Sequence, residues 1–122
     1  IKISLFINPY IDQIKIAKQL NVFAVELHTG LYCQRNKNRN KEYQKLKNSA
    51  RFAVENSLEC HAGHGINYNT VGKISKIYDI SELNIGHFII GESIFCGLKE
   101  SIIKMKRKIN NSRKNIILEK SA

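Results

Sequence analysis

Three short segments of the sequence combine a histidine or a glutamate with residues that end a predicted strand: Glu26-Leu27-His28, Gly63-His64-Gly65 and Gly86-His87. An imidazole donates or accepts a proton near neutral pH, so His64 suits general acid–base catalysis. The glycines beside it let the backbone turn sharply and let a ligand approach the amide groups. A loop histidine without a role is the competing interpretation, but the Gly-His-Gly frame at a strand end favours a functional one.

Glu26 is the candidate carboxylate. It lies in a predicted strand over residues 23–28, where alternation places it on the side opposite Val25 and Leu27. If the apolar side faces helices, Glu26 points into the interior of a barrel, where an ionised carboxylate is costly unless it is paired or hydrogen-bonded. Two interpretations stay open: a functional carboxylate, or a glutamate that pairs with a neighbouring Arg or Lys and fills the interior. Glu82 and Asn84 show the same pattern, and for them we favour hydrogen-bonded filling of the interior.

Gly86-His87 precedes a predicted long helix. The free backbone N–H groups and the dipole at a helix start attract an anion. In phosphate-binding barrels the loops after the last two strands hold the phosphate. Gly65 and Gly86-His87 would form such a site, and an ordinary glycine at a strand exit is the alternative.

The cysteines and His61 do not form an obvious site. His61 and His64 are three residues apart along a strand, so their side chains point to opposite sides and do not converge on one metal ion. Cys33, Cys60 and Cys96 are odd in number and widely spaced, and we expect them to pack rather than to form disulfides or to act as nucleophiles. This pattern favours a reducing, cytoplasmic setting.

Short apolar runs and helical spacing alternate along the chain. They predict strands over residues 2–7, 23–28, 59–62 and 82–85, and helices over 11–20, 41–58 and 70–77. Residues 36–40 are polar and indicate a mobile loop. A long final helix is marked by Ile90, Ile94, Leu98 and Ile102 and runs into a charged tail.

Four strand–helix units in succession demand parallel strands with right-handed crossovers, an α/β fold. Two architectures are common: a doubly wound open sheet and a (β/α)₈ (TIM) barrel. The unusual residues at successive strand ends favour the barrel, which gathers those ends around one mouth. Four units make half of a barrel. We assign residues 1–109 to this half and residues 110–122 to a basic tail, and the first residue, Ile1, suggests a cut or processed amino end.

The chain of 122 residues carries a net charge of +10, which first suggests nucleic acid or an anionic membrane. Seven basic side chains lie within residues 35–54 and eight within residues 97–122. Neither run has interleaved aromatic residues that could stack bases, so we favour solvated helix faces over a nucleic-acid surface. The apolar runs are too short to span a bilayer. We therefore expect neither nucleic acid nor a membrane as a partner.

Four ordered segments resemble the pyridoxine 5′-phosphate synthase family: SLFIN (residues 4–8), VELHTG (25–30), AGHGINY (62–68) and ELNIGHFIIGESIF (82–95). Their order and spacing match the carboxyl-terminal half of that family, a TIM barrel assembled as a homo-octamer. The resemblance implies condensation of 3-amino-2-oxopropyl phosphate with 1-deoxy-D-xylulose 5-phosphate, without a metal or organic cofactor. It assigns His64 as proton donor, Glu26 as transition-state stabiliser, and Gly65, Gly86 and His87 to the aminoketone phosphate.

The resemblance also implies that groups of the first half are missing here: a catalytic histidine with a nearby arginine, a general-base glutamate, and most groups for the deoxyxylulose phosphate. We therefore expect this chain alone to lack significant synthase activity. Two other hypotheses stay open. One is another phosphate-handling barrel, although no lysine stands at a predicted strand end to serve a Schiff-base aldolase. The other is a basic RNA-binding module using residues 35–51 and the tail.

Overall fold

The computed structural model describes residues 1–34 and 37–121. Its strands are β1 (Ser4–Ile7), β2 (Ala24–His28), β3 (Glu59–Gly63) and β4 (Glu82–Asn84). Its helices are α1 (Ile11–Gln19), α2 (Gly30–Cys33), α3 (Arg39–Glu55), α4 (Val71–Ser75), α5 (His87–Cys96) and α6 (Leu98–Ser121). No helix within these residues is long and apolar enough to cross a bilayer.

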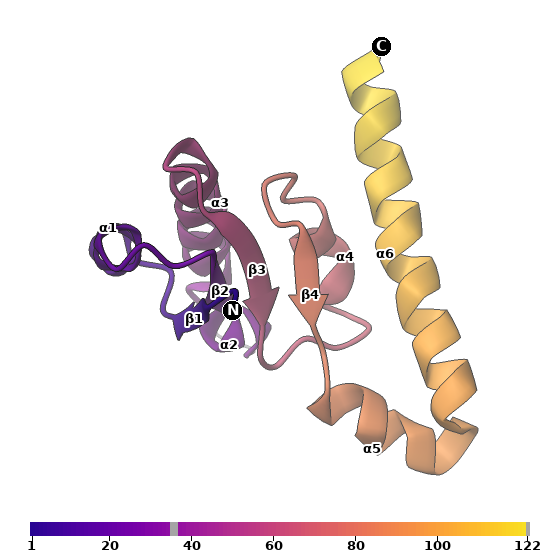
Figure 1. Cartoon of the computed structure of the whole chain (residues 1–122). Coiled ribbons are helices and arrows are strands. Elements are labelled where there is room, and N and C mark those ends of the chain that lie inside the picture. Colours follow the sequence, from indigo (N-terminus) through magenta and orange to yellow (C-terminus); the bar gives the residue numbers. More distant parts are fainter. Residues whose placement is uncertain (35–36, 122) are drawn as a thin grey trace.

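The four strands form one parallel sheet in the order β1-β2-β3-β4 (Figure 1). A doubly wound sheet reverses its strand order at a switch point, whereas a barrel keeps its strands in chain order. The observed order has no reversal. The structure is therefore α/β with the architecture of half of a (β/α)₈ barrel, which confirms the predicted fold class.

The two faces of the sheet differ in chemistry, as the alternation predicts. Val25, Leu27, Cys60 and Ala62 point to the helical side and are fully buried. The helices contribute to the same core with Ile14, Ala17, Leu46, Ala50, Ala53 and Ile74. Burial of this apolar surface is the main force that holds the helices onto the sheet.

The opposite, concave face carries mostly polar side chains in rows set by the strand register. One row contains Phe6, Glu26, His61 and Glu82. The next row toward the carboxyl ends contains His28, Gly63 and Asn84. The candidate side chains of β2 and β4 thus share the face that a complete barrel would enclose.

The long final helix is in fact two helices, so this prediction is wrong. α5 ends at Cys96 and α6 begins at Leu98, with Gly97 between them at φ 84° and ψ 150°. Only glycine adopts this conformation readily, so the chain turns there (Figure 1). The apolar spacing continues across the break and hides it in the sequence. Ile90, Ile94 and Leu98 are largely exposed rather than buried.

α6 runs back alongside α4 and continues through the expected basic tail (Figure 1). Arg113 donates hydrogen bonds to the carbonyl oxygens of Tyr78, at 3.2 Å, and of Ile80. Ile116 is buried, and Ser112 lies against Gly72 of α4. The division of the chain at residue 110 stays a prediction, but the described residues beyond it belong to a docked helix.

Two smaller differences lie between β2 and α3. A short helix, α2, follows directly after Thr29, where the sequence indicates only a turn. α3 begins at Arg39, so the end of the loop expected over residues 36–40 is helical. Asn36 of that loop, and Arg35 of the basic run, lie outside the described residues.

Candidate active site

A cavity of about 490 Å³ opens at the carboxyl ends of the strands. Five of its lining residues are those that the sequence singles out: Glu26, His64, Gly65, Gly86 and His87. Apolar side chains complete the wall, among them Phe6, Ile66, Ile85 and Phe88. The structure therefore brings all five candidates together, while their chemical roles stay predictions.

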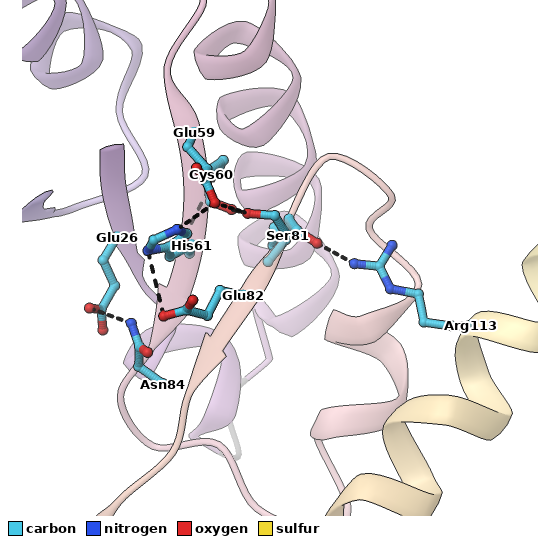
Figure 2. A network of polar contacts seen from close by, with 9 residues as sticks. Glu26, Glu59, Cys60, His61, Ser81, Glu82, Asn84 and Arg113 are labelled. Carbon is cyan, nitrogen blue, oxygen red and sulfur yellow. Dashed lines mark hydrogen bonds and ion pairs between the residues drawn. The ribbon is translucent and has the colours of Figure 1, made fainter. Parts of the chain in front are cut away.

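Glu26 projects from β2 onto the concave face and meets Asn84 of β4 (Figure 2). The Asn84 amide nitrogen donates a hydrogen bond to Glu26 Oε2 at 2.8 Å. Of the alternatives for Glu26, the pairing with an Arg or Lys is not the contact seen, because the hydrogen-bond partner is a neutral amide. An amide orients the carboxylate without neutralising its charge, which leaves that charge available to a ligand.

Gly63 makes the contact between Glu26 and Asn84 possible. It lies on the intervening strand β3, level with Asn84 and one row beyond Glu26, so the contact between Glu26 and Asn84 runs diagonally past it. A Cβ at Gly63 would clash with Glu26 Oε1 and would lie 3.0 Å from the Asn84 carbonyl oxygen. The missing side chain therefore leaves the gap through which Glu26 reaches across one strand. Asn84 and Gly63 are site residues that sequence reasoning did not assign, because their part depends on strand register.

His64 follows β3 in a left-handed backbone conformation, with φ 76°. Such a conformation is uncommon for a residue other than glycine and marks a tight turn that its surroundings must hold. The Thr29 hydroxyl is shared between the carbonyl oxygens of Gly63, at 2.9 Å, and His64, at 2.5 Å. Thr29 is fully buried at the end of β2, so it fixes the turn that presents the His64 imidazole to the cavity.

Gly65 continues the same turn with φ 77°. A side chain there would be strained, and its Cβ would lie 3.2 Å from Cys33 Cβ. Gly65 thus closes the turn against α2.

His28 packs against His64 from the end of β2. The two ring centroids are 4.5 Å apart, and the ring planes differ by 23°. Burial, and secondly the charge of His64, lower the pKa of His28. The sequence analysis names His28 in the segment Glu26-Leu27-His28 but assigns it no role. The signal for His28 in the sequence is its position at a strand end, two residues after Glu26. Its contact with His64 depends on the tertiary structure.

Gly86 and His87 begin α5 at the far side of the cavity. The first backbone hydrogen bond of this helix runs from Ile90 N–H to Gly86 O. The N–H groups before it have no intrahelical acceptor, which is the geometry that binds anions. A Cβ at Gly86 would meet nothing within 4 Å. Packing within the described chain therefore does not require glycine there, in contrast to Gly63.

The remaining polar side chains of the sheet lie deeper on the concave face (Figure 2). His61 Nε2 is 3.2 Å from Glu59, and His61 Nδ1 is 3.9 Å from Glu82. Glu82 shares this face but is largely exposed, so its expected part in filling the interior stays a prediction. Among the described residues, no three His, Cys, Asp or Glu side chains are grouped so as to hold a metal ion.

Cys60 points to the helical side of β3. Burial, with a smaller contribution from Asp79, raises the pKa of its thiol to about 12. The thiolate is the nucleophilic form, so this thiol is inert at neutral pH. The packing role expected for Cys60 is confirmed by its complete burial. Cys33 is half-buried, and Cys96 is exposed, so the expectation that Cys96 packs in the core is wrong.

A second cavity, of about 640 Å³, lies at the opposite ends of the strands. It is lined by residues 1–3, 21–23, 54 and 57–59. It contains none of the five candidate residues, and parallel-barrel enzymes carry their chemistry at the carboxyl ends of the strands. The smaller cavity is therefore the candidate active site.

Comparison with known proteins agrees with this geometry. Residues 1–111 match the family described as "Pyridoxal phosphate biosynthesis protein PdxJ". The chain belongs to this family. The resemblance drawn from the four sequence segments is thereby confirmed.

Curated relatives in the family carry the name pyridoxine 5′-phosphate synthase. The chain is 49% identical over 113 residues to that of Pelagibacter ubique (strain HTCC1062), covering 90% of this chain and 47% of the relative. It is 46% identical over 111 residues to that of Ehrlichia ruminantium (strain Gardel), covering 91% and 46%. It is 45% identical over 115 residues to that of Sulfurihydrogenibium sp. (strain YO3AOP1), covering 93% and 47%. The chain spans about half the length of these relatives.

Proposed function

We propose that this chain supplies four βα units of a pyridoxine 5′-phosphate synthase. The complete enzyme condenses 3-amino-2-oxopropyl phosphate with 1-deoxy-D-xylulose 5-phosphate, and its products are pyridoxine 5′-phosphate, phosphate and water. The observation that carries this proposal is that Glu26, His64, Gly65, Gly86 and His87 line a single cavity in a chain of this family.

The phosphate of the aminoketone binds at the start of α5. The amide groups there and the helix dipole attract an anion. Gly65 and Gly86 let the phosphate approach the backbone closely, and His87 adds an imidazole donor. Holding the phosphate fixes the reacting carbon atoms near His64 and Glu26, which lowers the entropic cost of reaction.

His64 donates a proton, and Glu26 stabilises positive charge that develops in the transition state. Schiff-base formation, loss of water and ring closure each move protons at carbon or oxygen, which suits an imidazole and a carboxylate in a pocket that excludes water. The Asn84 amide holds the Glu26 carboxylate in place for this role. Thr29 holds the turn that carries His64.

The complete enzyme needs further βα units, and this chain alone lacks significant synthase activity. The partners we propose are phosphorylated small molecules and further copies of the complete enzyme in a homo-octamer. We place the enzyme in the cytoplasm, in keeping with three free cysteines.

Reconstitution tests the proposal. The 122-residue chain is mixed with the amino-terminal half of the Pelagibacter ubique relative, and formation of pyridoxine 5′-phosphate is assayed. We expect product from the mixture and none from either part. His64→Ala in the mixture lowers turnover by about a hundredfold or more. His61→Ala, at a histidine of β3 that does not line the cavity, is the matched control and retains turnover. Full turnover by the chain alone, or by the His64→Ala mixture, contradicts the proposal.

A further inference from the structure

His28 lies behind the wall of the candidate active site rather than in it. The described lining of the cavity includes Phe6 and His64, and His28 packs against both of these rings. Its ring centroid is 5.3 Å from that of Phe6 and 4.5 Å from that of His64. His28 itself is not among the residues that line the cavity.

The ring of His64 needs such a support. His64 is exposed and sits on a turn with positive φ, so its backbone alone does not restrict the imidazole to one orientation. Its aromatic contacts are with His28, nearly parallel at 23°, and with Phe6, more distant at 6.5 Å. The stack with His28 is therefore the contact that sets the plane of the His64 ring.

Three successive residues at the end of β2 cooperate in this support. Thr29 holds the backbone carbonyl of His64 with its hydroxyl. Gly30 leaves the space in which the two rings meet: a Cβ there would clash with His28 Cε1 and would lie 3.1 Å from His64 Cδ2. The stack forms only because residue 30 has no side chain.

The hydrogen bonding of His28 fixes its own ring. The Gly30 N–H donates to His28 Nδ1 at 3.3 Å. Nδ1 must then carry a lone pair, so the neutral ring has its proton on Nε2. A neutral ring beside His64 matters because two charged imidazoles at this distance repel each other. A proton on His64 is therefore compatible with the stack.

We propose that His28 is a positioning residue for His64: held by the Gly30 amide, its neutral ring stacks on the His64 imidazole and orients it toward the cavity. The proposal rests on the proposed function where it concerns proton donation to substrate. The stacking itself is independent of that function, and the two are tested separately.

The first test measures the stack by NMR in the 122-residue chain. The ring protons of His64 should be shifted from random-coil positions by the neighbouring aromatic ring. We expect His28→Ala to abolish this shift and His28→Phe, which restores a flat aromatic ring, to retain most of it. Gly30→Ala should act like His28→Ala by forcing the rings apart, and His61→Ala serves as control. Random-coil positions in the unsubstituted chain, or no change in His28→Ala, overturn the proposal.

The second test uses the reconstituted synthase. We expect His28→Ala to lower kcat about tenfold, because misorientation of a catalytic group slows the chemical step. KM for 3-amino-2-oxopropyl phosphate should stay unchanged, because the phosphate of this substrate binds at the start of α5 and not at His28. His28→Phe should recover most of the lost kcat. Equal losses in both variants, or a change confined to KM, overturn the positioning role. Absence of synthase turnover without any substitution refutes the proposed function and leaves the NMR test of the stack intact.

Discussion

Neighbouring side chains set the chemistry of individual residues at this site. His28 and His64 share a stack, Glu26 takes its orientation from Asn84, and Gly63 leaves the gap that this second contact needs. Each arrangement couples residues from different strands. Substitutions at the residue scale should therefore act on a partner as much as on the substituted position.

The pKa of His28 offers a direct test of this coupling. It lies below the usual 6.5 because of burial first and the charge of His64 second. The groups that face the ring are His64, Phe6 and the Gly30 amide. His64→Ala should raise the pKa of His28, because it removes the like charge and part of the burial. An NMR pH titration of the ring protons measures this, and an unchanged His28 pKa in the variant refutes the coupling.

The same shift predicts how stability depends on pH. Since the folded chain binds a proton at His28 less readily than the unfolded chain, the unfolded state gains protons first as pH falls. The contribution of His28 to the free energy of unfolding is therefore lost as pH drops below about 6.5. His28→Phe should flatten the pH dependence of denaturant unfolding between about pH 7 and pH 5. A steeper pH dependence in His28→Phe would show that folding raises, rather than lowers, the pKa of His28.

Thiol reactivity separates Cys60 from Cys96. Cys60 is fully buried with a pKa near 12, whereas Cys96 is exposed. In the folded chain, iodoacetamide at pH 8 should label Cys96 and leave Cys60 unmodified until denaturant is added. Mass spectrometry of peptides identifies the labelled sites. Rapid labelling of Cys60 without denaturant contradicts its placement in the core.

Gly63 and Gly86 should respond differently to alanine. Gly63→Ala forces Glu26 from its place beside Asn84, so we expect a loss of about 1–3 kcal/mol in the free energy of unfolding and a lower kcat after reconstitution. Gly86→Ala meets open space, so its cost in stability should be about 1 kcal/mol or less, with a higher KM for the aminoketone phosphate. Denaturant unfolding and steady-state kinetics measure both. Equal effects of the two substitutions on stability would refute this distinction.

At the scale of elements, α6 is the part of the chain whose role the sequence conceals. Its basic composition indicates a solvated tail, yet Arg113 bonds to carbonyl oxygens beside β4 and Ile116 is buried. The helix also covers α4 through Ser112 and Gly72. α6 therefore stabilises the segment that leads into β4, the strand that carries Asn84.

Arg113→Ala tests this anchoring. The substitution leaves the carbonyl oxygens of Tyr78 and Ile80 without the guanidinium donor, so we expect a loss of about 1–2 kcal/mol in the free energy of unfolding. Lys114→Ala, at the exposed neighbouring position, is the matched control and should change little. Urea unfolding of the variants decides the question, and equal stability of both contradicts the anchoring.

At the scale of the whole molecule, the structure is a half-barrel with one face covered. Helices bury the side of the sheet that carries Val25 and Leu27, while Phe6, Glu82 and Asn84 on the concave face remain exposed. Within the described residues, β1 and β4 each pair with one neighbour, so each has an open edge. Unpaired edges and exposed apolar side chains favour association with a complementary sheet.

Addition of the amino-terminal half of a relative should therefore stabilise this chain. Binding to the folded state alone raises the apparent stability by mass action. We expect the midpoint of thermal unfolding, measured by circular dichroism, to rise with increasing concentration of the added half. A midpoint that does not change at excess contradicts the proposal that the chain is completed by further βα units.

Much of the fold follows from local sequence patterns. Alternation in residues 23–28 identified which side of β2 is polar, and helical spacing over residues 41–58 predicted the helix that the structure has as α3. Glycine and histidine at the strand ends, together with Glu26 on the polar side of β2, identified five residues that line one cavity. These features depend on side-chain direction and backbone preference within a few residues, so a single sequence contains them.

Other features became clear only in three dimensions. The strand order distinguished a half-barrel from a doubly wound sheet, and packing brought Asn84 to Glu26 diagonally, past Gly63. The stack of His28 on His64 and the turn at Gly97 belong to the same group. The sequence alone thus determined which residues face the concave side and stand at its rim. Tertiary structure decided which of them touch, because such contacts depend on how distant segments pack and not on any local preference.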